Sequence, residues 1–256
     1  MNIKDSIVVI DSGVGGLNIF YSLKKEFPNE NYIFLGDSKY FPYGIKDKYF
    51  LGNRLDQILS YFEEAKAIII ACNTATSVLP YTTPRKNVIG IIELTAQSAC
   101  KKTLTGNIVC VATNLTIELE GYQKAIKELG KNCFPVKASE FVELIESKHT
   151  LTQEEYNLQM RSIVAEKLTP FKDQNVDTLI CGCTHFGYLI DYFKEVLGDI
   201  NYVISDDAVC ENIHKYTSLN NSSNPKTYIY TTGDSFDFSE KMHSLGFTDN
   251  ALNLDI

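Results

Sequence analysis

The two halves of the chain carry matching segments in the same order. In each half an apolar run comes first, and a second apolar run further along ends at a cysteine that small polar residues follow. The first runs end at Asp11-Ser12 and at Ala112-Thr113, and the second runs end at Cys72-Asn73-Thr74 and at Cys183-Thr184-His185. This repetition predicts a chain of two similar units, each of which presents one thiol at the end of a strand.

Apolar runs of strand length alternate with longer amphipathic stretches along the chain. Several of the runs are continuously hydrophobic, which is typical of parallel strands that helices cover on both faces, and the βα alternation predicts an open α/β sandwich. The expected strands are residues 7–10, 32–35, 67–72, 88–92, 107–111, 178–183, 202–204 and 227–231. The expected helices are residues 16–26, 47–61, 95–102, 116–129, 139–147, 154–171 and 187–197.

We therefore expect an α/β protein of two pseudo-symmetric domains, each an open parallel-sheet α/β sandwich, with the active site in the cleft between them. The first domain comprises residues 1–94 plus 207–256, and the second comprises residues 95–206. Ligands of open parallel sheets bind outside the carboxyl ends of the strands, where the matched motifs fall. A thiol on either side of a ligand is the geometry needed to take a proton from one face of a carbon and return one to the other.

Net charge, hydrophobic runs and cysteine count restrict the partners and the compartment that this protein can have. The formal net charge is −8, and the absence of a Lys/Arg block argues against nucleic acid as a partner. No apolar run approaches the roughly 18 residues of a membrane-spanning helix, and the N-terminal residues do not read as a secretory signal. Seven cysteines are an odd number without the spacing of a small disulfide scaffold, so we expect free thiols in a reducing compartment. These features predict a cytoplasmic protein with a small-molecule ligand and no membrane contact.

The segment 11–16 joins a strand to a helix through three glycines, which allow close approach of a ligand to the backbone and to the free N–H groups of the helix. A dinucleotide site is one interpretation, with Asp37 as the ribose-binding acid, but Asn18 stands where the third glycine of that fingerprint belongs. Asp11 would also repel a pyrophosphate. A small carboxylate ligand that Ser12 helps to bind fits best, and a tight turn without any ligand is the other alternative. The aromatic loop 37–44 is similarly open to two interpretations, a packed turn or a wall of the same site.

Cys72 and Cys183 are candidates for acid–base chemistry because a thiol at a helix N-terminus, beside hydroxyl and amide donors, has a lowered pKa and a larger thiolate fraction. Cys100, Cys110, Cys133 and Cys210 lie in apolar or helical contexts or lack a partner motif, and we assign them to packing. Two alternatives concern the segment 181–185. A Cys181-x-Cys183-x-His185 metal site lacks the usual ligand spacing, and a redox pair would need C-x-x-C. His185 could tune the second thiol or shuttle protons, and Asp11 could do the same for the first.

Five motifs in register resemble the cofactor-independent glutamate racemases of the aspartate/glutamate racemase superfamily. The similarity extends in order and spacing from residue 7 to about residue 190 and continues more weakly beyond it. The motifs are Asp11-Ser12-Gly13-x-Gly15-Gly16, Gly36-Asp37 with Pro42-Tyr43-Gly44, Ala71-Cys72-Asn73-Thr74-Ala75, Gly90-Ile91-Ile92-Glu93 and Gly182-Cys183-Thr184-His185.

The resemblance implies conversion of L-glutamate to D-glutamate by two catalytic cysteines, without cofactor or metal. It implies catalytic roles for Cys72, Cys183, Asp11, His185 and Glu146. It implies that the substrate is bound by Asp11, Ser12, Tyr43, Gly44, Asn73, Thr74, Thr116, Thr184 and His185. A homodimer and a role in supplying D-glutamate for peptidoglycan follow from the same resemblance. The alternatives are racemisation of aspartate or a related amino acid, and a non-catalytic protein that binds small anions.

Overall fold

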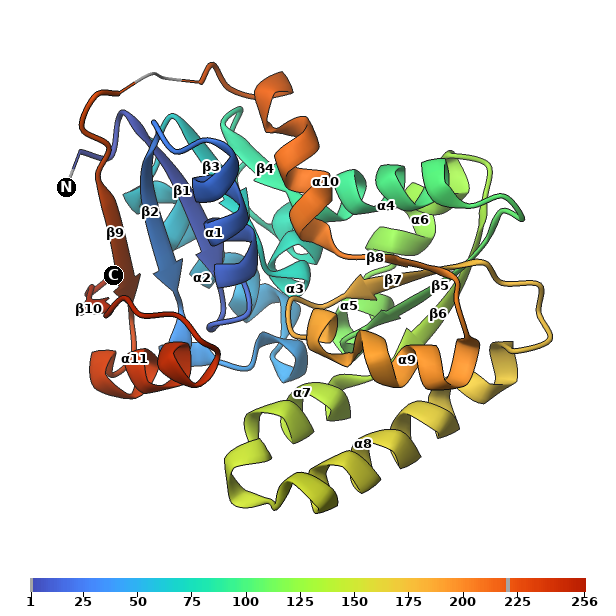
Figure 1. Ribbon diagram of the computed structural model, residues 1–256. Coiled ribbons are helices and arrows are strands. Elements are labelled where there is room, and N and C mark those ends of the chain that lie inside the picture. Colours follow the sequence, from blue (N-terminus) through green and yellow to red (C-terminus); the bar gives the residue numbers. More distant parts are fainter. Residues whose placement is uncertain (1, 220–221) are drawn as a thin grey trace. The chain divides into compact units, whose positions relative to one another are not determined.

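The computed structural model describes residues 2–219 and 222–256. The chain divides into two compact units (Figure 1). Unit 1 comprises Met1–Ile91 together with Asp206–Ile256, and unit 2 comprises Ile92–Ser205.

Unit 1 is built on a parallel sheet with the strand order β10-β9-β2-β1-β3-β4. Its strands are β1 (Ser6–Asp11), β2 (Asn31–Gly36), β3 (Ala67–Ile70), β4 (Val88–Gly90), β9 (Thr227–Thr231) and β10 (Leu252–Asn253). Strands β1 and β3 lie in the middle of the sheet and are completely buried, which explains their uninterrupted apolar sequences.

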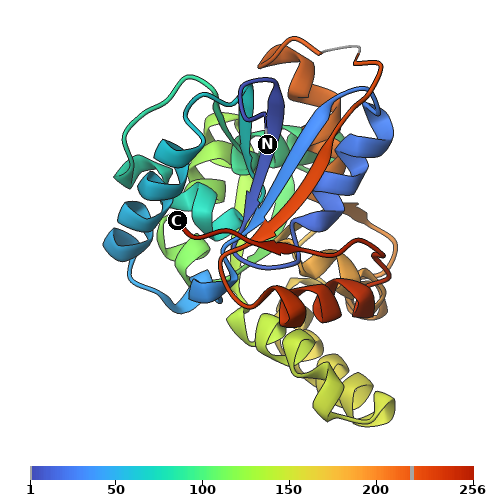
Figure 2. The ribbon, with the colours of Figure 1, turned by 90° about the vertical axis from the view of Figure 1, so that its left-hand side faces the viewer.

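Helices cover both faces of this sheet. In the sheet, β2 and β3 lie on opposite sides of β1, so the connection from β1 to β2 and the connection from β2 to β3 run in opposite directions. Because both crossovers are right-handed, their helices α1 and α2 lie on opposite faces of the sheet (Figure 2). The helices of unit 1 are α1 (Leu17–Glu26), α2 (Lys48–Tyr61), α3 (Asn73–Ser77), α10 (Ser205–Asn212, which begins at the last residue of unit 2) and α11 (Ser235–Ser244). Short 3₁₀ turns are η1 (Ser38–Tyr40), η2 (Tyr43–Ile45), η3 (Leu79–Tyr81) and η7 (Ile213–Lys215).

Unit 2 contains a second parallel sheet, with the order β6-β5-β7-β8. Its strands are β5 (Asn107–Ala112), β6 (Asn132–Lys137), β7 (Thr178–Gly182) and β8 (Asn201–Val203). Its helices are α4 (Ile91–Lys102), α5 (Asn114–Glu118), α6 (Gly121–Glu128), α7 (Ser139–Glu146), α8 (Gln153–Leu168) and α9 (Ile190–Leu197). Its 3₁₀ turns are η4 (Lys148–Thr150), η5 (Thr169–Phe171) and η6 (Phe186–Leu189).

The two sheets repeat one topology. The order β2-β1-β3-β4 of unit 1 and the order β6-β5-β7-β8 of unit 2 are the same arrangement of four consecutive strands. Cys72 follows β3 and Cys183 follows β7, which are equivalent strands of this repeat. The predicted fold class of two α/β units on open parallel sheets is therefore confirmed, and the structure adds that the two units repeat one strand order.

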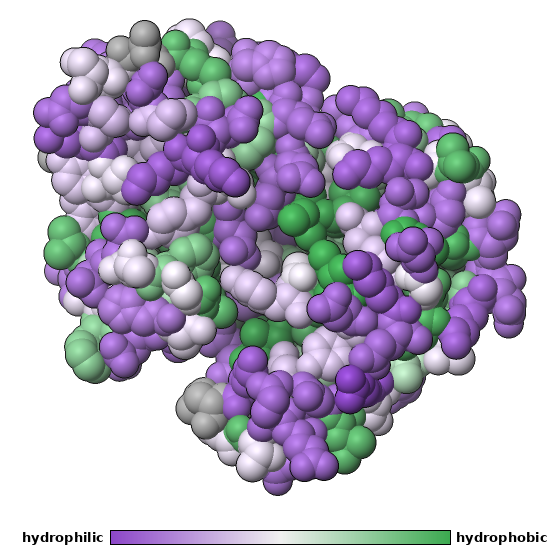
Figure 3. All heavy atoms as spheres, viewed as in Figure 1, coloured by the Kyte–Doolittle hydropathy of each residue, from purple (hydrophilic) through white to green (hydrophobic). Residues whose placement is uncertain are grey.

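Apolar side chains fill the interior of each unit. In unit 2 one core cluster joins the sheet to helices α4 and α6 through Ile108, Ile180, Ala96 and Tyr122. Hydrophilic side chains predominate on the face of the molecule that Figure 3 shows. Among the described helices the longest, α8, has 16 residues, and none is long and apolar enough to cross a bilayer.

Several expected element boundaries are wrong. The run 88–92 is a strand only as far as Gly90, because Ile91 already begins α4. The expected helix 116–129 is interrupted at Glu120, whose φ of 60° is left-handed, and this break separates α5 from α6. The sequence pattern also did not predict β6, α10 or the short β10.

Candidate active site

Asp11 is the last residue of β1, and its side chain packs against the loop that leads into α1. The carboxylate is buried and accepts a hydrogen bond from the backbone N–H of Gly13, 2.8 Å away. A Cβ at Gly16 would lie 2.6 Å from the Cβ of Asp11, so this close approach requires glycine. The glycine-rich turn thus packs tightly against a buried carboxylate.

Cys72 lies directly beyond β3 and forms the N-cap of α3. Its sulfur accepts a hydrogen bond from the backbone N–H of Ala75 at 3.5 Å, and the Ser12 hydroxyl lies 3.6 Å from it. Ile10 and Ile70 are partners in the β1–β3 register, which brings Ser12 and Cys72 to the same place at the sheet edge. A backbone N–H directed at sulfur at a helix N-terminus is a contact that stabilises a thiolate.

The polar residues that follow Cys72 are buried with it. Asn73 and Thr74 form the first turn of α3 and expose 2% and 3% of their surface. Their place directly after Cys72 suits contacts with a polar ligand at the thiol.

Tyr43 and Gly44 form the turn η2, which packs against α3. The Tyr43 hydroxyl donates a hydrogen bond to Oδ2 of Asp37 at 2.5 Å. Burial and the charge of Asp37 raise the pKa of Tyr43 well above its ordinary value, and the charge of a Cys72 thiolate raises it further. Tyr43 thus stays protonated close to the first thiol.

Cys183 follows β7 in unit 2 and contacts a buried histidine. Nδ1 of His185 lies 3.9 Å from the Cys183 sulfur, and Nε2 lies 3.2 Å from Oε1 of Glu146, the last residue of α7. Burial by itself would lower the pKa of His185, but the hydrogen bonds to Cys183 and Glu146 outweigh it and raise this pKa to about 10. His185 is therefore an imidazolium ion at neutral pH, between a carboxylate and a thiol.

Thr116 lies at the carboxyl end of the neighbouring strand β5. It is buried in α5, and its hydroxyl is 2.8 Å from that of Thr113. Ala112 and Gly182 are partners in the β5–β7 register, so Thr113 and Cys183 both directly follow paired residues. Thr184, next to Cys183, is half-buried. Unit 2 therefore gathers hydroxyl groups around its thiol as unit 1 does.

The structure thus brings the predicted residues together in two sets, one for each unit. The set in unit 1 is Asp11, Ser12, Tyr43, Gly44, Cys72, Asn73 and Thr74. The set in unit 2 is Thr116, Glu146, Cys183, Thr184 and His185.

Sequence reasoning missed Arg54, a buried residue of α2 that forms an ion pair with Asp37 at 2.6 Å. The structure also gives Asp37 this partner in place of the ribose that the dinucleotide interpretation assigned to it. A single arginine within an amphipathic helix carries no sequence signal of burial, since arginine is mostly exposed.

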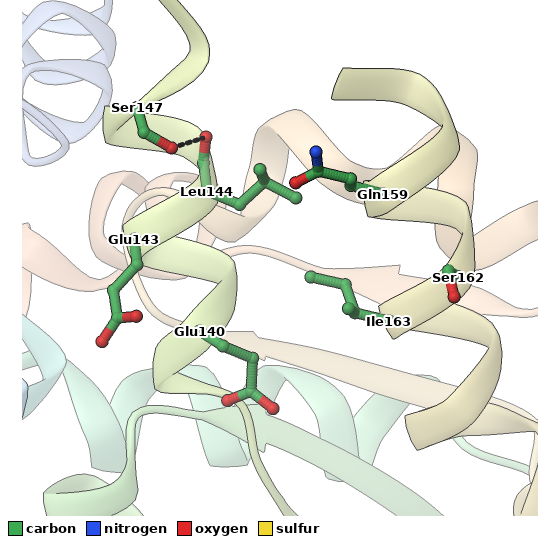
Figure 4. Close-up of a pocket in the computed structure, with 7 residues that line it drawn as sticks. All are labelled: Glu140, Glu143, Leu144, Ser147, Gln159, Ser162 and Ile163. Atoms are coloured by element: carbon green, nitrogen blue, oxygen red, sulfur yellow. Dashed lines mark hydrogen bonds between the residues drawn. The ribbon is translucent and has the colours of Figure 1, made fainter. Parts of the chain in front are cut away.

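A separate groove of about 520 Å³ lies between helices α7 and α8 of unit 2 (Figure 4). Its lining residues are Glu140, Glu143, Leu144, Ser147, Gln159, Ser162 and Ile163. None of these is a predicted site residue, although α7 also carries Glu146. Across residues 2–219 and 222–256, no three His, Cys, Asp or Glu side chains are grouped so as to hold a metal ion.

Comparison with known proteins identifies the class to which this fold and site belong. A match to the Asp/Glu/hydantoin racemase family covers residues 24–203, and the chain belongs to this family. It is thus an enzyme of the amino-acid racemase class, and this prediction from the sequence is confirmed.

Its relatives within the family are glutamate racemases. The protein of that name from Thermoanaerobacter pseudethanolicus is 32% identical, over 98% of this chain and 97% of its own. The one from Lysinibacillus sphaericus is 33% identical, over 89% of each chain. The crystal structure of a glutamate racemase isoform from Bacillus anthracis aligns with a TM-score of 0.87 and 28% identity, over 98% of both chains.

Proposed function

We propose that this protein interconverts L-glutamate and D-glutamate without a cofactor, using Cys72 and Cys183 as its two acid–base groups. The observation that carries the proposal is the repeat: each unit presents one thiol after an equivalent strand, among buried hydroxyl and amide groups. The names of the relatives support glutamate as the substrate.

In the proposed reaction the two thiols act on opposite faces of the substrate α-carbon. One cysteine, as thiolate, accepts the α-proton and becomes a thiol, and the electron pair of the C–H bond remains on a planar carbanionic intermediate. The other cysteine, as thiol, gives its proton to the opposite face and becomes the thiolate. Each cysteine removes the α-proton of one of the two enantiomers. After one turnover the thiolate and the thiol have exchanged places, which is the protonation state that the reverse reaction needs.

The surrounding donors hold the substrate and stabilise the developing charge. The α-proton of an amino acid is weakly acidic, so preorganised donors at the carboxylate supply much of the rate. We assign this role to the backbone N–H groups of the two sites and to the side chains of Ser12, Asn73, Thr74, Thr116 and Thr184, with Tyr43 and Gly44 as a further wall. To Asp11, a buried carboxylate at the end of the strand next to β3, we assign a role in assisting the first thiol.

His185 and Glu146 form a charged pair beside the second thiol. The imidazolium ion of His185 faces the Cys183 sulfur, and Glu146 stabilises the imidazolium ion. Because the pKa of His185 is about 10, we assign it an electrostatic role and leave acceptance of the substrate proton to sulfur.

The cellular context is part of the same proposal. We infer that the protein supplies D-glutamate for peptidoglycan, acts in the cytoplasm as a homodimer, and uses its two units as domains that each contribute one thiol. All seven cysteines lie in the described part of the chain and are free thiols, which supports a reducing compartment.

Substitution of each thiol tests the proposal. Cys72→Ala and Cys183→Ala should each lower the racemisation rate by about 10³-fold or more, because each removes one of two obligatory proton carriers. Cys100→Ala is the matched control, since this half-buried thiol of α4 lies outside both sets and should keep the wild-type rate. Circular dichroism verifies folding. Near-wild-type turnover by either single variant would exclude the two-base mechanism.

A further inference from the structure

We propose that Arg54 is a positioning residue for substrate binding, which acts through Asp37 to hold the turn of Tyr43 and Gly44 in place. This inference rests on the proposed function, since it assigns substrate contact to that turn. Arg54 lies on α2 and donates to the same oxygen of Asp37, Oδ2, as Tyr43 does, and it belongs to none of the motifs that the sequence singles out.

The contact between Arg54 and Asp37 is bidentate and buried. Nε of Arg54 donates to Oδ2 of Asp37 at 3.0 Å, and Nη2 donates to Oδ1 at 2.6 Å. Arg54 exposes 4% of its surface and Asp37 exposes none. The planar guanidinium fork fixes the orientation of the carboxylate as well as neutralising its charge, which a lysine could not do.

The carboxylate of Asp37 then holds two further groups. Oδ2 accepts a hydrogen bond from the Tyr43 hydroxyl at 2.5 Å, and Oδ1 accepts one from the Thr232 hydroxyl at 2.7 Å. Asp37 follows β2 and Thr232 follows β9, so one buried carboxylate connects two strand ends, helix α2 and the turn η2. The same guanidinium group also donates to the backbone oxygen of Ile256 at 2.9 Å and stacks over the ring of Tyr40.

In this arrangement the Tyr43 side chain holds the backbone of its own turn in place. Its hydroxyl proton is committed to Asp37, and its raised pKa keeps the proton there, so the side chain fixes the turn and transfers no proton. Without Arg54, Asp37 would be a buried carboxylate with no cation, which is strongly unfavourable. The carboxylate would then rearrange or admit water, and the geometry that holds Tyr43 would be lost.

The test is steady-state kinetics of Arg54→Gln, Arg54→Lys, Tyr43→Phe and the double variant R54Q/Y43F. We expect R54Q to raise the KM for glutamate by about tenfold while kcat changes by less than about threefold. This pattern arises when a variant loses an interaction that binds the substrate and the transition state equally well. R54K keeps the charge but not the fork and should raise KM less. The double variant should have the KM of the worse single variant, because both changes interrupt the same chain of contacts.

Arg85→Gln provides the matched control for general destabilisation. Arg85 forms a 2.7 Å ion pair with Asp56 of α2, outside the turn, and its loss should leave KM unchanged. An unchanged KM in R54Q would overturn the role of Arg54. If R54Q does not fold, an unchanged KM in R54K would overturn it. Effects of the two single substitutions on KM that multiply in the double variant would also overturn it. A wild-type protein that does not racemise glutamate would overturn the proposed function together with this role, so the two failures are distinguishable.

Discussion

His185 acts at the residue scale as a fixed positive charge. Its imidazolium ion lies between Glu146 and Cys183 inside unit 2, and its pKa is raised to about 10 because these two partners outweigh the effect of burial. The sign of the linkage follows from this shift. The imidazolium contributes fully to stability below its unfolded pKa near 6.5, and the contribution is lost as pH rises through about 10.

Glu146→Gln tests this electrostatic role. Removal of the carboxylate lowers the pKa of His185, so less imidazolium is present beside the Cys183 sulfur at neutral pH. We expect kcat/KM at pH 7 to fall by about tenfold to a hundredfold, less than the roughly 10²–10⁴-fold of a group that transfers the proton itself, because Glu146 acts only through His185. The loss should shrink as pH approaches 10, because the imidazolium ion of the wild-type protein is then lost as well. Initial rates between pH 6 and pH 10 measure the profile.

Glu143→Gln is the control on the same helix. Glu143 is exposed on α7, one turn before Glu146, and its neutralisation should leave the pH profile unchanged. A wild-type profile in Glu146→Gln would show that the carboxylate has no part in the reaction.

At the scale of elements, the ends of the strands determine where the chemistry can occur. Gly182 is the last residue of β7 and directly precedes Cys183. A Cβ at Gly182 would lie 2.8 Å from the Cβ of Ala112 and 2.9 Å from the carbonyl oxygen of Val111, both on β5. The close approach of these two strands therefore positions the second thiol.

Gly182→Ala should displace the end of β7 from β5. We expect a loss of about 1–3 kcal/mol in the free energy of unfolding, as for overpacked cores, and a fall in racemisation beyond what the unfolded fraction explains. Urea unfolding and initial rates provide the two measurements. Gly187→Ala should change neither, since its new Cβ would meet only Ile204 at 3.7 Å. Equal behaviour of the two variants would contradict this account of the strand end.

The elements also show what the sequence could and could not predict. Central strands such as β1 and β3 could be recognised because burial on both faces leaves continuous apolar runs. Strand β6 could not, because it is an edge strand that contains Pro135 and exposes several residues, so its sequence resembles a loop. The left-handed Glu120 likewise interrupts an amphipathic pattern that continues on both sides of it.

For the candidate site, the motifs at strand ends predicted which residues lie together within each unit. Ser12 and Cys72 meet because their strands are neighbours in register, and the sequence order of the strands already indicated this sheet edge. Arg54 could not be predicted, because its partnership with Asp37 depends on how α2 packs against the end of β2. Contacts that depend on helix packing leave no local sequence pattern.

At the scale of the whole molecule, the repeat of one sheet topology is the central structural fact. Two equivalent strands, β3 and β7, end at the two cysteines, and each unit surrounds its thiol with buried donors. A chain that duplicates one unit can provide the same kind of group twice. Inversion of a carbon centre by two bases requires two such groups.

The most direct test of this account follows the optical activity of L-glutamate in D₂O by circular dichroism, with purified, dialysed protein, reducing agent and no added cofactor. We predict that the signal decays to zero and that deuterium is found at the α-carbon. Decay with aspartate and none with either enantiomer of glutamate would contradict the proposed substrate. No decay with either amino acid would contradict catalysis under these conditions and would favour a protein that only binds small anions.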